Sequence, residues 1–375
     1  MAGIYIHIPF CKQACHYCDF HFSTNSSKQH EMVCAIAKEL QIQKDYLGHN
    51  IIETIYFGGG TPSLLSKEDL NIILGAVRQN YKVSDSPEIC LEANPDDLSN
   101  EKFVELADAG VNRLSIGIQT FHDEHLAYLN RAHSSQEARA CVDRARSSGI
   151  NNISIDLIYA IPSSDHQIWE EDLAQAMALK PDHISSYCLT IENKTAFGNW
   201  LSKGKIKPIN EEFAAQQFEI LIETMYDNGY EQYEVSNFCL PNQYSKHNSN
   251  YWKQQQYLGV GPSAHSYNGV HRQFNISHNQ KYLSTMALGE IPYTLDILND
   301  KDHINEYLLT SLRTKWGADM TFLKTKHGYD LLHDQEEYLE ELRGKELAII
   351  QNDTLYLTNR GKLFADKIAS DLFLV

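Results

Sequence analysis

The chain has 375 residues, and its 32 lysines and arginines against 49 aspartates and glutamates give a formal net charge of −17. This length predicts two or three domains with a sizeable core, and the acidic balance disfavours nucleic acid or an anionic membrane as the main partner. No run approaches the roughly 20 apolar residues of a membrane span, and the N-terminal segment has no signal-peptide pattern. We therefore expect a cytoplasmic protein with at most peripheral membrane contact.

Apolar runs of β character alternate with helical patterns through the first half of the chain. Strands are expected at residues 3–8, 53–57, 87–92, 112–119, 150–158 and 183–189. The helices between them are expected at residues 28–47, 67–80, 100–109, 134–148 and 166–179. This alternation predicts parallel βα units, arranged either as an open doubly wound sheet or as a full or partial (β/α) barrel.

The alternation stops after residue 189. A helix is expected at 211–228, followed by an apolar segment at 230–238 and a stretch rich in Gly, Asn and His at 241–278. Helices near 304–314 and 335–344, a hairpin at 347–357 and a helix from 359 are typical of a small winged-helix-like module. Residues 301–375 carry 10 Lys and Arg against 13 Asp and Glu, so this module is expected to pack against protein rather than to bind DNA.

Three of the eight cysteines lie within eight residues, directly after the first expected strand. Cys11, Cys15 and Cys18 have the spacing C-x3-C-x2-C. Three thiolates on one short loop can hold three irons of a [4Fe–4S] cube and leave the fourth iron open to another ligand. Zinc is the alternative, with His7 or His16 nearby, although structural zinc sites prefer four protein ligands.

The cysteine triplet, with an aromatic residue before its last cysteine, resembles the motif of the radical SAM enzymes. In that family S-adenosylmethionine binds the open iron, and electron transfer from the cluster cleaves it to a 5′-deoxyadenosyl radical. The glycine-rich turn at 58–62 resembles the family's contact for the amino group of this cofactor. Glu92, Gln119, Arg131 and Asp156 lie at or near the ends of expected strands, where barrel folds carry their active sites.

Three phrases resemble one subgroup of that family, the anaerobic coproporphyrinogen oxidases and the heme chaperones related to them. They are YIHIPFC at 5–11, FGGGTP at 57–62 and DLIY at 156–159. The resemblance spans essentially the whole chain and implies an α/β fold: a partial (β/α)6 barrel over residues 1–200, an extension over 201–295 and the winged-helix-like module over 296–375. It implies a cluster on Cys11, Cys15 and Cys18. It also implies that S-adenosylmethionine contacts Tyr5, Tyr17, Gly59, Gly60, Thr61, Glu92, Gln119, Arg131 and Asp156.

Three features separate the two functions of the subgroup. The oxidases have a further cysteine two residues after the triplet, where this chain has Phe20, and a longer arm before the first strand. The segment HNSNYW at 247–252 matches the H-N-x-x-Y pattern of the heme chaperone branch. The resemblance therefore implies a heme site at His247, Asn248 and Tyr251, in which His247 either ligates the iron or shapes a pocket; His265 is a second candidate ligand.

The expected function is that of a heme chaperone, which contains a cluster ligated by S-adenosylmethionine and delivers heme to a respiratory heme protein. An oxygen-independent coproporphyrinogen III oxidase, which decarboxylates propionates by radical chemistry, is the alternative, so whether the chain is an enzyme stays open at this point. A zinc-dependent interaction module is a third interpretation. The expected partners are heme and a heme-accepting protein, and a cluster-dependent homodimer is compatible with the resemblance.

Overall fold

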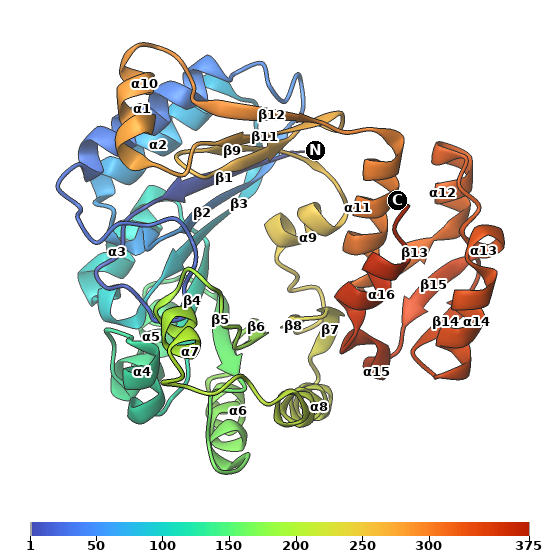
Figure 1. The fold of residues 1–375 in the computed structure, drawn as a ribbon. Helices are drawn as coiled ribbons and strands as arrows, with labels where there is room; N and C mark the ends of the chain where they lie inside the picture. Colours follow the sequence, from blue (N-terminus) through green and yellow to red (C-terminus); the bar gives the residue numbers. More distant parts are fainter. Residues whose placement is uncertain (1, 375) are drawn as a thin grey trace.

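The computed structural model describes residues 2–374, and its centre is a twelve-stranded sheet (Figure 1). Six strands run parallel and lie side by side in chain order: β1 (Ala2–Ile8), β2 (Ile52–Gly59), β3 (Val83–Ala93), β4 (Arg113–Gln119), β5 (Asn152–Tyr159) and β6 (His183–Cys188). A doubly wound sheet would reverse its strand order at a switch point, whereas a barrel does not. The order therefore decides between the two predicted architectures, and the partial barrel is confirmed.

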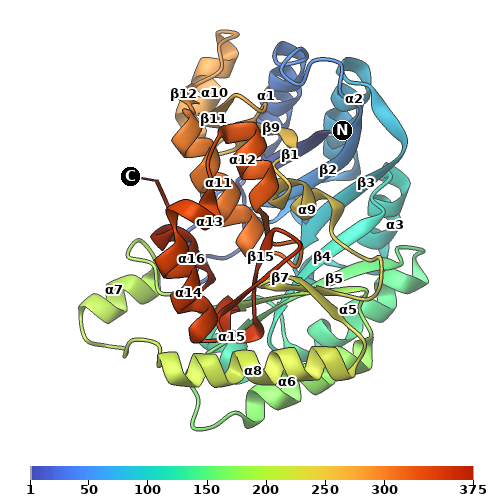
Figure 2. The same ribbon diagram turned by 90° about the vertical axis from the view of Figure 1, so that its right-hand side faces the viewer.

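Helices on the outside of the sheet connect these strands, as the two views in Figures 1 and 2 show. They are α1 (Gln29–Ile42), α2 (Lys67–Asn80), α3 (Asn100–Ala109), α5 (Ser135–Ser147) and α6 (Gln167–Leu179). Ser66, Ser99 and Ser134 begin three of them, and each accepts a backbone N–H bond from the residue three positions on. The predicted ranges agree closely except for α1, which ends five residues early in turns that lead to Gly48, where φ is 59°.

Two short helices, α4 (Asp123–Leu129) and α7 (Ala196–Ser202), were not predicted. Seven residues are too few to show a helical period clearly.

The extension after β6 adds strands to both edges of the barrel sheet. After α8 (Glu211–Asp227), β7 (Glu231–Glu234) and β8 (Asn237–Cys239) continue the sheet beyond β6. After α9 (Lys246–Trp252), β9 (Gln256–Val260) pairs in parallel with β1, and β10 (His265–Tyr267), β11 (His271–Asn275), α10 (Asn279–Ala287) and β12 (Tyr293–Ile297) follow. No elements were predicted within the stretch rich in Gly, Asn and His at 241–278, because its strands are short and glycines at 261 and 269 interrupt the apolar pattern.

Residues from Ile304 to Leu372 form a second hydrophobic core. Its helices are α11 (Asp300–Leu312), α12 (Met320–His327), α13 (Leu331–Asp334), α14 (Glu336–Gly344), α15 (Asn359–Lys362) and α16 (Ala365–Asp371). Its sheet has the order β13 (Ala318–Asp319), β15 (Thr354–Leu357) and β14 (Ala348–Gln351). The predicted hairpin is present, whereas the single helix expected from residue 359 is interrupted at residues 363 and 364. Within residues 2–374, no helix combines the length and the apolar character that crossing a membrane requires.

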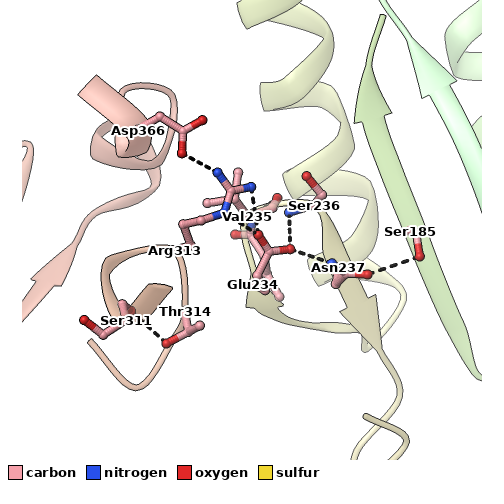
Figure 3. Close-up of polar contacts among 10 residues, drawn as sticks. Ser185, Glu234, Val235, Ser236, Asn237, Ser311, Arg313, Thr314 and Asp366 are labelled. Carbon is pink, nitrogen blue, oxygen red and sulfur yellow. Dashed lines mark hydrogen bonds and ion pairs between the residues drawn. The ribbon is translucent and has the colours of Figure 1, made fainter. Parts of the chain in front are cut away.

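A buried ion pair joins this part of the chain, which runs from α11 to α16 and which we call the C-terminal module, to the barrel (Figure 3). Glu234 at the end of β7 is 1% exposed and accepts a 2.9 Å bond from Nε of Arg313, which also pairs with Asp366. On the barrel side, Asn237 donates to Glu234 and accepts a 3.1 Å bond from the Ser185 hydroxyl on β6. Continuous hydrogen bonding therefore connects a barrel strand to the module.

Candidate functional site

A cavity of about 500 Å³ opens where the C-terminal ends of β1 to β6 converge. Its lining includes the three predicted cluster cysteines and all of the predicted S-adenosylmethionine residues except Tyr5: Cys11, Cys15, Cys18, Tyr17, Gly59, Gly60, Thr61, Glu92, Gln119, Arg131 and Asp156. These residues are far apart in the sequence, and most lie at a strand end or in the following loop, whereas Asp156 lies within β5 and Arg131 follows α4. The shared end of a parallel barrel is therefore what brings them together.

The three cysteines lie half-buried on the loop after β1. The loop is held at both ends, because Cys11 N–H donates to the carbonyl of Ser23 at 3.1 Å and His16 N–H donates to that of Leu129 at 3.1 Å. Nη1 of Arg131 lies 3.4 Å from the sulfur of Cys15, so a positive charge faces this thiol. No group of three or more His, Cys, Asp or Glu side chains in residues 2–374 is arranged to hold a single metal ion.

The glycine-rich turn after β2 packs directly against the cysteine loop. Gly60 N–H donates to the carbonyl of Ile8 at 2.8 Å, and a Cβ added at Gly60 would lie 2.5 Å from the carbonyl oxygen of Phe10. Gly59 has a φ of 103°, and its added Cβ would lie 2.6 Å from the ring of His7. The approach of the cysteine loop thus requires Gly60, whereas the His7 ring of β1 and the positive φ require Gly59, and both glycines line the cavity.

Two half-buried carboxyl groups face the cavity. Glu92 accepts bonds from the Tyr56 hydroxyl at 2.8 Å and from Gly59 N–H at 3.2 Å, while Asp156 accepts one from the Ser115 hydroxyl at 3.2 Å. Burial raises the pKa of Glu92 to about 7 and that of Asp156 to about 6, and the nearby charge of Asp156 adds to the rise at Glu92. A cationic ligand would favour the ionised form of both groups, so the cavity suits a molecule with a positive amino or sulfonium group.

The guanidinium of Arg131 is also buried beside the cavity. Its Nη2 donates to Asn94 and, at 2.7 Å, to the carbonyl of Gly117. Its Nε has no hydrogen-bond partner, which leaves one buried donor available for an acceptor such as a carboxylate. Gln119, with a φ of 67°, follows a register shift in β4 and lines the same cavity.

Several lining residues were missed from the sequence. Gly117 and Ser115 lie two and four residues before Gln119 on β4, so the period of two in a strand could have identified them. Asn94 and Ser185 carried no local signal. Cys188 lies half-buried at the end of β6 and lines the cavity, and as a single cysteine in a strand it gave no sign of this from the sequence.

The HNSNYW segment lies on α9, which packs against β1 and β2 behind this cavity. The His247 ring is 1% exposed; its Nδ1 is 2.8 Å from the Thr54 hydroxyl and its Nε2 is 2.8 Å from the Tyr251 hydroxyl. It stacks on Tyr56 with the ring centroids 5.0 Å apart, and burial lowers its pKa to about 3, so the ring is neutral. Asn248 lines the cavity itself.

Two further predicted residues lie outside the cavity lining. The Tyr5 hydroxyl is 3.1 Å from Nδ1 of His7, and its ring stacks on Tyr56, which places it one layer behind the cavity wall. His265 is exposed on β10 and stacks on Phe274.

Comparison with known proteins agrees with this geometry. The model of the radical SAM superfamily matches residues 5–174. The chain is 36% identical over 372 residues to the heme chaperone HemW of Bacillus subtilis (strain 168), covering 98% of each chain. It is 34% identical to HemW of Lactococcus lactis subsp. lactis (strain IL1403), covering 95% of this chain and 93% of the relative. The chain therefore belongs to the radical SAM superfamily and, within it, to the family of HemW proteins, as the resemblance predicted.

Among solved structures, the coproporphyrinogen III oxidase HemN from Escherichia coli has a similar fold. Its TM-score is 0.85, with 99% of this chain and 90% of that chain covered, and the two sequences are 20% identical. At this identity the likeness establishes the fold alone.

Membership of the superfamily implies an iron–sulfur cluster bound by S-adenosylmethionine, and the cavity fits both groups. Three thiols from one loop, a glycine turn, two half-buried carboxyl groups and the unpaired Nε of Arg131 all meet there. The pKa of the Cys11 thiol is raised to about 11 and that of Cys18 to about 12, in both cases chiefly by burial, so these are protonated thiols until an iron site binds them as thiolates.

Proposed function

We propose that this protein is a heme chaperone, which binds heme and delivers it to a respiratory heme protein. The observation that carries the proposal is the near full-length similarity to proteins named heme chaperone HemW, at 36% identity for the Bacillus subtilis relative. Two features of the sequence also support the proposal: the HNSNYW segment, and Phe20 at the position where the oxidases have a further cysteine. Free thiols and an iron–sulfur cluster suit a reducing compartment, so we place the protein in the cytoplasm.

The cluster would be held by Cys11, Cys15 and Cys18, with S-adenosylmethionine on its open iron. When bound, this pair supplies one-electron chemistry and a radical precursor. The chain's own residues would bind and orient it: Glu92 and Asp156 offer negative charge to its cationic groups. Its carboxylate would meet the buried donor of Arg131. The remaining contacts are assigned to Tyr17, Gly59, Gly60, Thr61 and Gln119, with Tyr5 acting from behind the wall.

We propose that His247, Asn248 and Tyr251 shape a pocket and that His247 does not ligate the heme iron. Both ring nitrogens of His247 already have partners, and the ring lies under Tyr56, whose hydroxyl donates to Glu92. Ligation of iron by His247 would require one of these bonds to break and the buried ring to turn outward. The segment typical of heme chaperones therefore supports the wall of the cofactor cavity.

An anaerobic heme titration of the iron–sulfur-reconstituted protein, followed at the Soret band, tests the proposal. Stoichiometric binding is expected, and the Cys11→Ala/Cys15→Ala/Cys18→Ala variant shows whether it depends on the cluster. The heme affinity of the His247→Ala variant is compared with that of His265→Ala, in which an exposed histidine is removed. The comparison separates an effect of the HNSNYW motif from the loss of a surface histidine. Conversion of coproporphyrinogen to protoporphyrinogen by the same protein would replace the proposal with the oxidase, and zinc without iron or sulfide would indicate the interaction module.

A further inference from the structure

A second cavity, of about 560 Å³, lies between the barrel and the C-terminal module, and we call it the module cleft. The barrel contributes Trp252 and Lys253 at the end of α9, and the module contributes Trp316, Phe322 and Lys326. Figures 1 and 2 show α9 facing α11 across this boundary, and α11 and α9 are in contact. No residue that lines the cysteine cavity also lines the module cleft, so the two sites are separate within the described chain.

Aromatic rings of the module with lysines on their faces line one wall of the module cleft. Nζ of Lys253 lies 4.3 Å from the centroid of the Trp316 ring, and Nζ of Lys326 lies 5.0 Å from that of Phe322. Tyr307 packs against Phe322 with the centroids 4.8 Å apart. Lysine has a flexible stem, so each ammonium group can leave a ring face for a carboxylate and free that face for a flat ligand.

The charge of the module cleft contrasts with that of the whole chain. Two lysines, Lys253 and Lys326, line it against one acidic residue, Asp319, in a protein with a net charge of −17. The indole N–H of Trp252 is buried there without a hydrogen-bond partner. The cleft therefore combines flat apolar surface, an excess of positive charge and an unused donor, which suits a planar aromatic dicarboxylate.

We propose that the module cleft binds the porphyrin of heme, with the macrocycle against the aromatic walls and the two propionates on Lys253 and Lys326. This inference rests on the proposed function, because it names the site at which the chaperone holds its cargo. Among the described residues, neither histidine nor cysteine lines the cleft. The cleft therefore recognises the porphyrin ring and its carboxylates and not the metal ion. Zinc protoporphyrin should consequently bind there as ferric heme does.

The polar contacts drawn in Figure 3 connect a residue next to the cleft wall with a residue of the cysteine cavity, and the two cavities share no lining residue. The guanidinium of Arg313 lies 5.5 Å from the Trp252 ring on the cleft wall and is held by Glu234. From Glu234, hydrogen bonds continue through Asn237 to Ser185, which lines the cysteine cavity. Both sites can thus be filled at once, so S-adenosylmethionine does not compete with porphyrin.

The test uses the full, cluster-reconstituted chain with ferric heme and zinc protoporphyrin as probes. Lys253→Glu/Lys326→Glu reverses both charges at exposed positions and leaves the core intact. Lys345→Glu/Lys367→Glu is the matched control, because it makes the same two charge reversals at exposed positions of the module outside the cleft. The dimethyl ester of zinc protoporphyrin, which has no free carboxylate, separates charge recognition from general affinity for a hydrophobic ring.

The double reversal is expected to weaken both acid probes by at least about tenfold, since two charge-assisted contacts become repulsive. The control should change their affinity by less than about twofold, and binding of the ester should be insensitive to both variants. Equal heme affinity of the parent and the double variant, or displacement of heme by S-adenosylmethionine, would contradict the assignment of the heme site to the module cleft. Neither result would contradict the chaperone function. Absence of heme binding by the parent protein would overturn both.

Discussion

Replacement of Glu92 by glutamine should change stability and cofactor binding in opposite directions. Burial raises the pKa of this carboxyl from 4.5 to about 7 in the folded chain, so folding increases its affinity for a proton. Its contribution therefore favours the folded state at low pH and is lost as the pH rises from about 4.5 to about 7. Glutamine has no charge to bury, so Glu92→Gln should remove this loss of stability at high pH.

The structure sets the size of the effect. At about 1.4 kcal/mol for each pH unit, ionised Glu92 costs about 3 kcal/mol of folding free energy above pH 7. Glutamine keeps an acceptor for the Tyr56 hydroxyl but loses the one for Gly59 N–H, which costs about 1 kcal/mol. Glu92→Gln should therefore stabilise the cofactor-free protein by about 2 kcal/mol at pH 8 and destabilise it slightly near pH 4.5.

Urea unfolding of the cofactor-free protein, followed by far-UV circular dichroism at both pH values, measures this difference. The exposed Glu219→Gln provides the control for loss of one carboxylate. In the cluster-loaded protein, Glu92→Gln should weaken binding of S-adenosylmethionine, and parent binding should weaken below about pH 7 as Glu92 takes up its proton. A pH-independent stability difference, or unchanged cofactor affinity, would refute this role for Glu92.

Three further variants test other contacts. Gly60→Ala should lower the free energy of unfolding in urea by about 1–3 kcal/mol, because the added Cβ meets backbone atoms. Gly75→Ala has open space around it in α2 and should raise this free energy by up to about 1 kcal/mol. Equal effects of the two substitutions would contradict the packing of the glycine turn against the cysteine loop. Arg313→Ala should lower the free energy of unfolding by about 3 kcal/mol, because it leaves the Glu234 carboxylate buried and unpaired. The double variant Glu234→Gln/Arg313→Met should recover most of this stability. If it does not, the unpaired charge is not the cause of the loss. Cys18→Ala should lose iron, sulfide and cluster absorption with unchanged far-UV circular dichroism.

Much of the barrel could be predicted because its signals are local. The ranges of α2 and α3 agreed residue for residue, since each has a serine cap and a helical apolar period. The cysteine triplet and the glycine turn are short motifs whose spacing is visible without any tertiary contact. The parallel strands then placed Glu92, Gln119 and Asp156 at one end of the sheet.

The remainder depended on contacts between distant segments. β9 pairs with β1 although about 250 residues separate them, and a strand of five residues with a glycine inside it shows little pattern of its own. The environment of His247 depends on Thr54 and Tyr56 of β2, so its buried, doubly bonded state could not be inferred from HNSNYW. The module cleft arises only where α9 meets the C-terminal module, for the same reason.

Transfer of heme from this protein to a heme-free acceptor tests the chaperone function most directly. The cluster-reconstituted protein would be loaded anaerobically with one equivalent of heme, mixed with apo-cytochrome and followed at the Soret bands of donor and acceptor. The account predicts that heme leaves the chain and appears on the acceptor faster than it does after release from a non-specific carrier such as albumin. Retention of heme by the chain, or transfer no faster than from albumin, would contradict it.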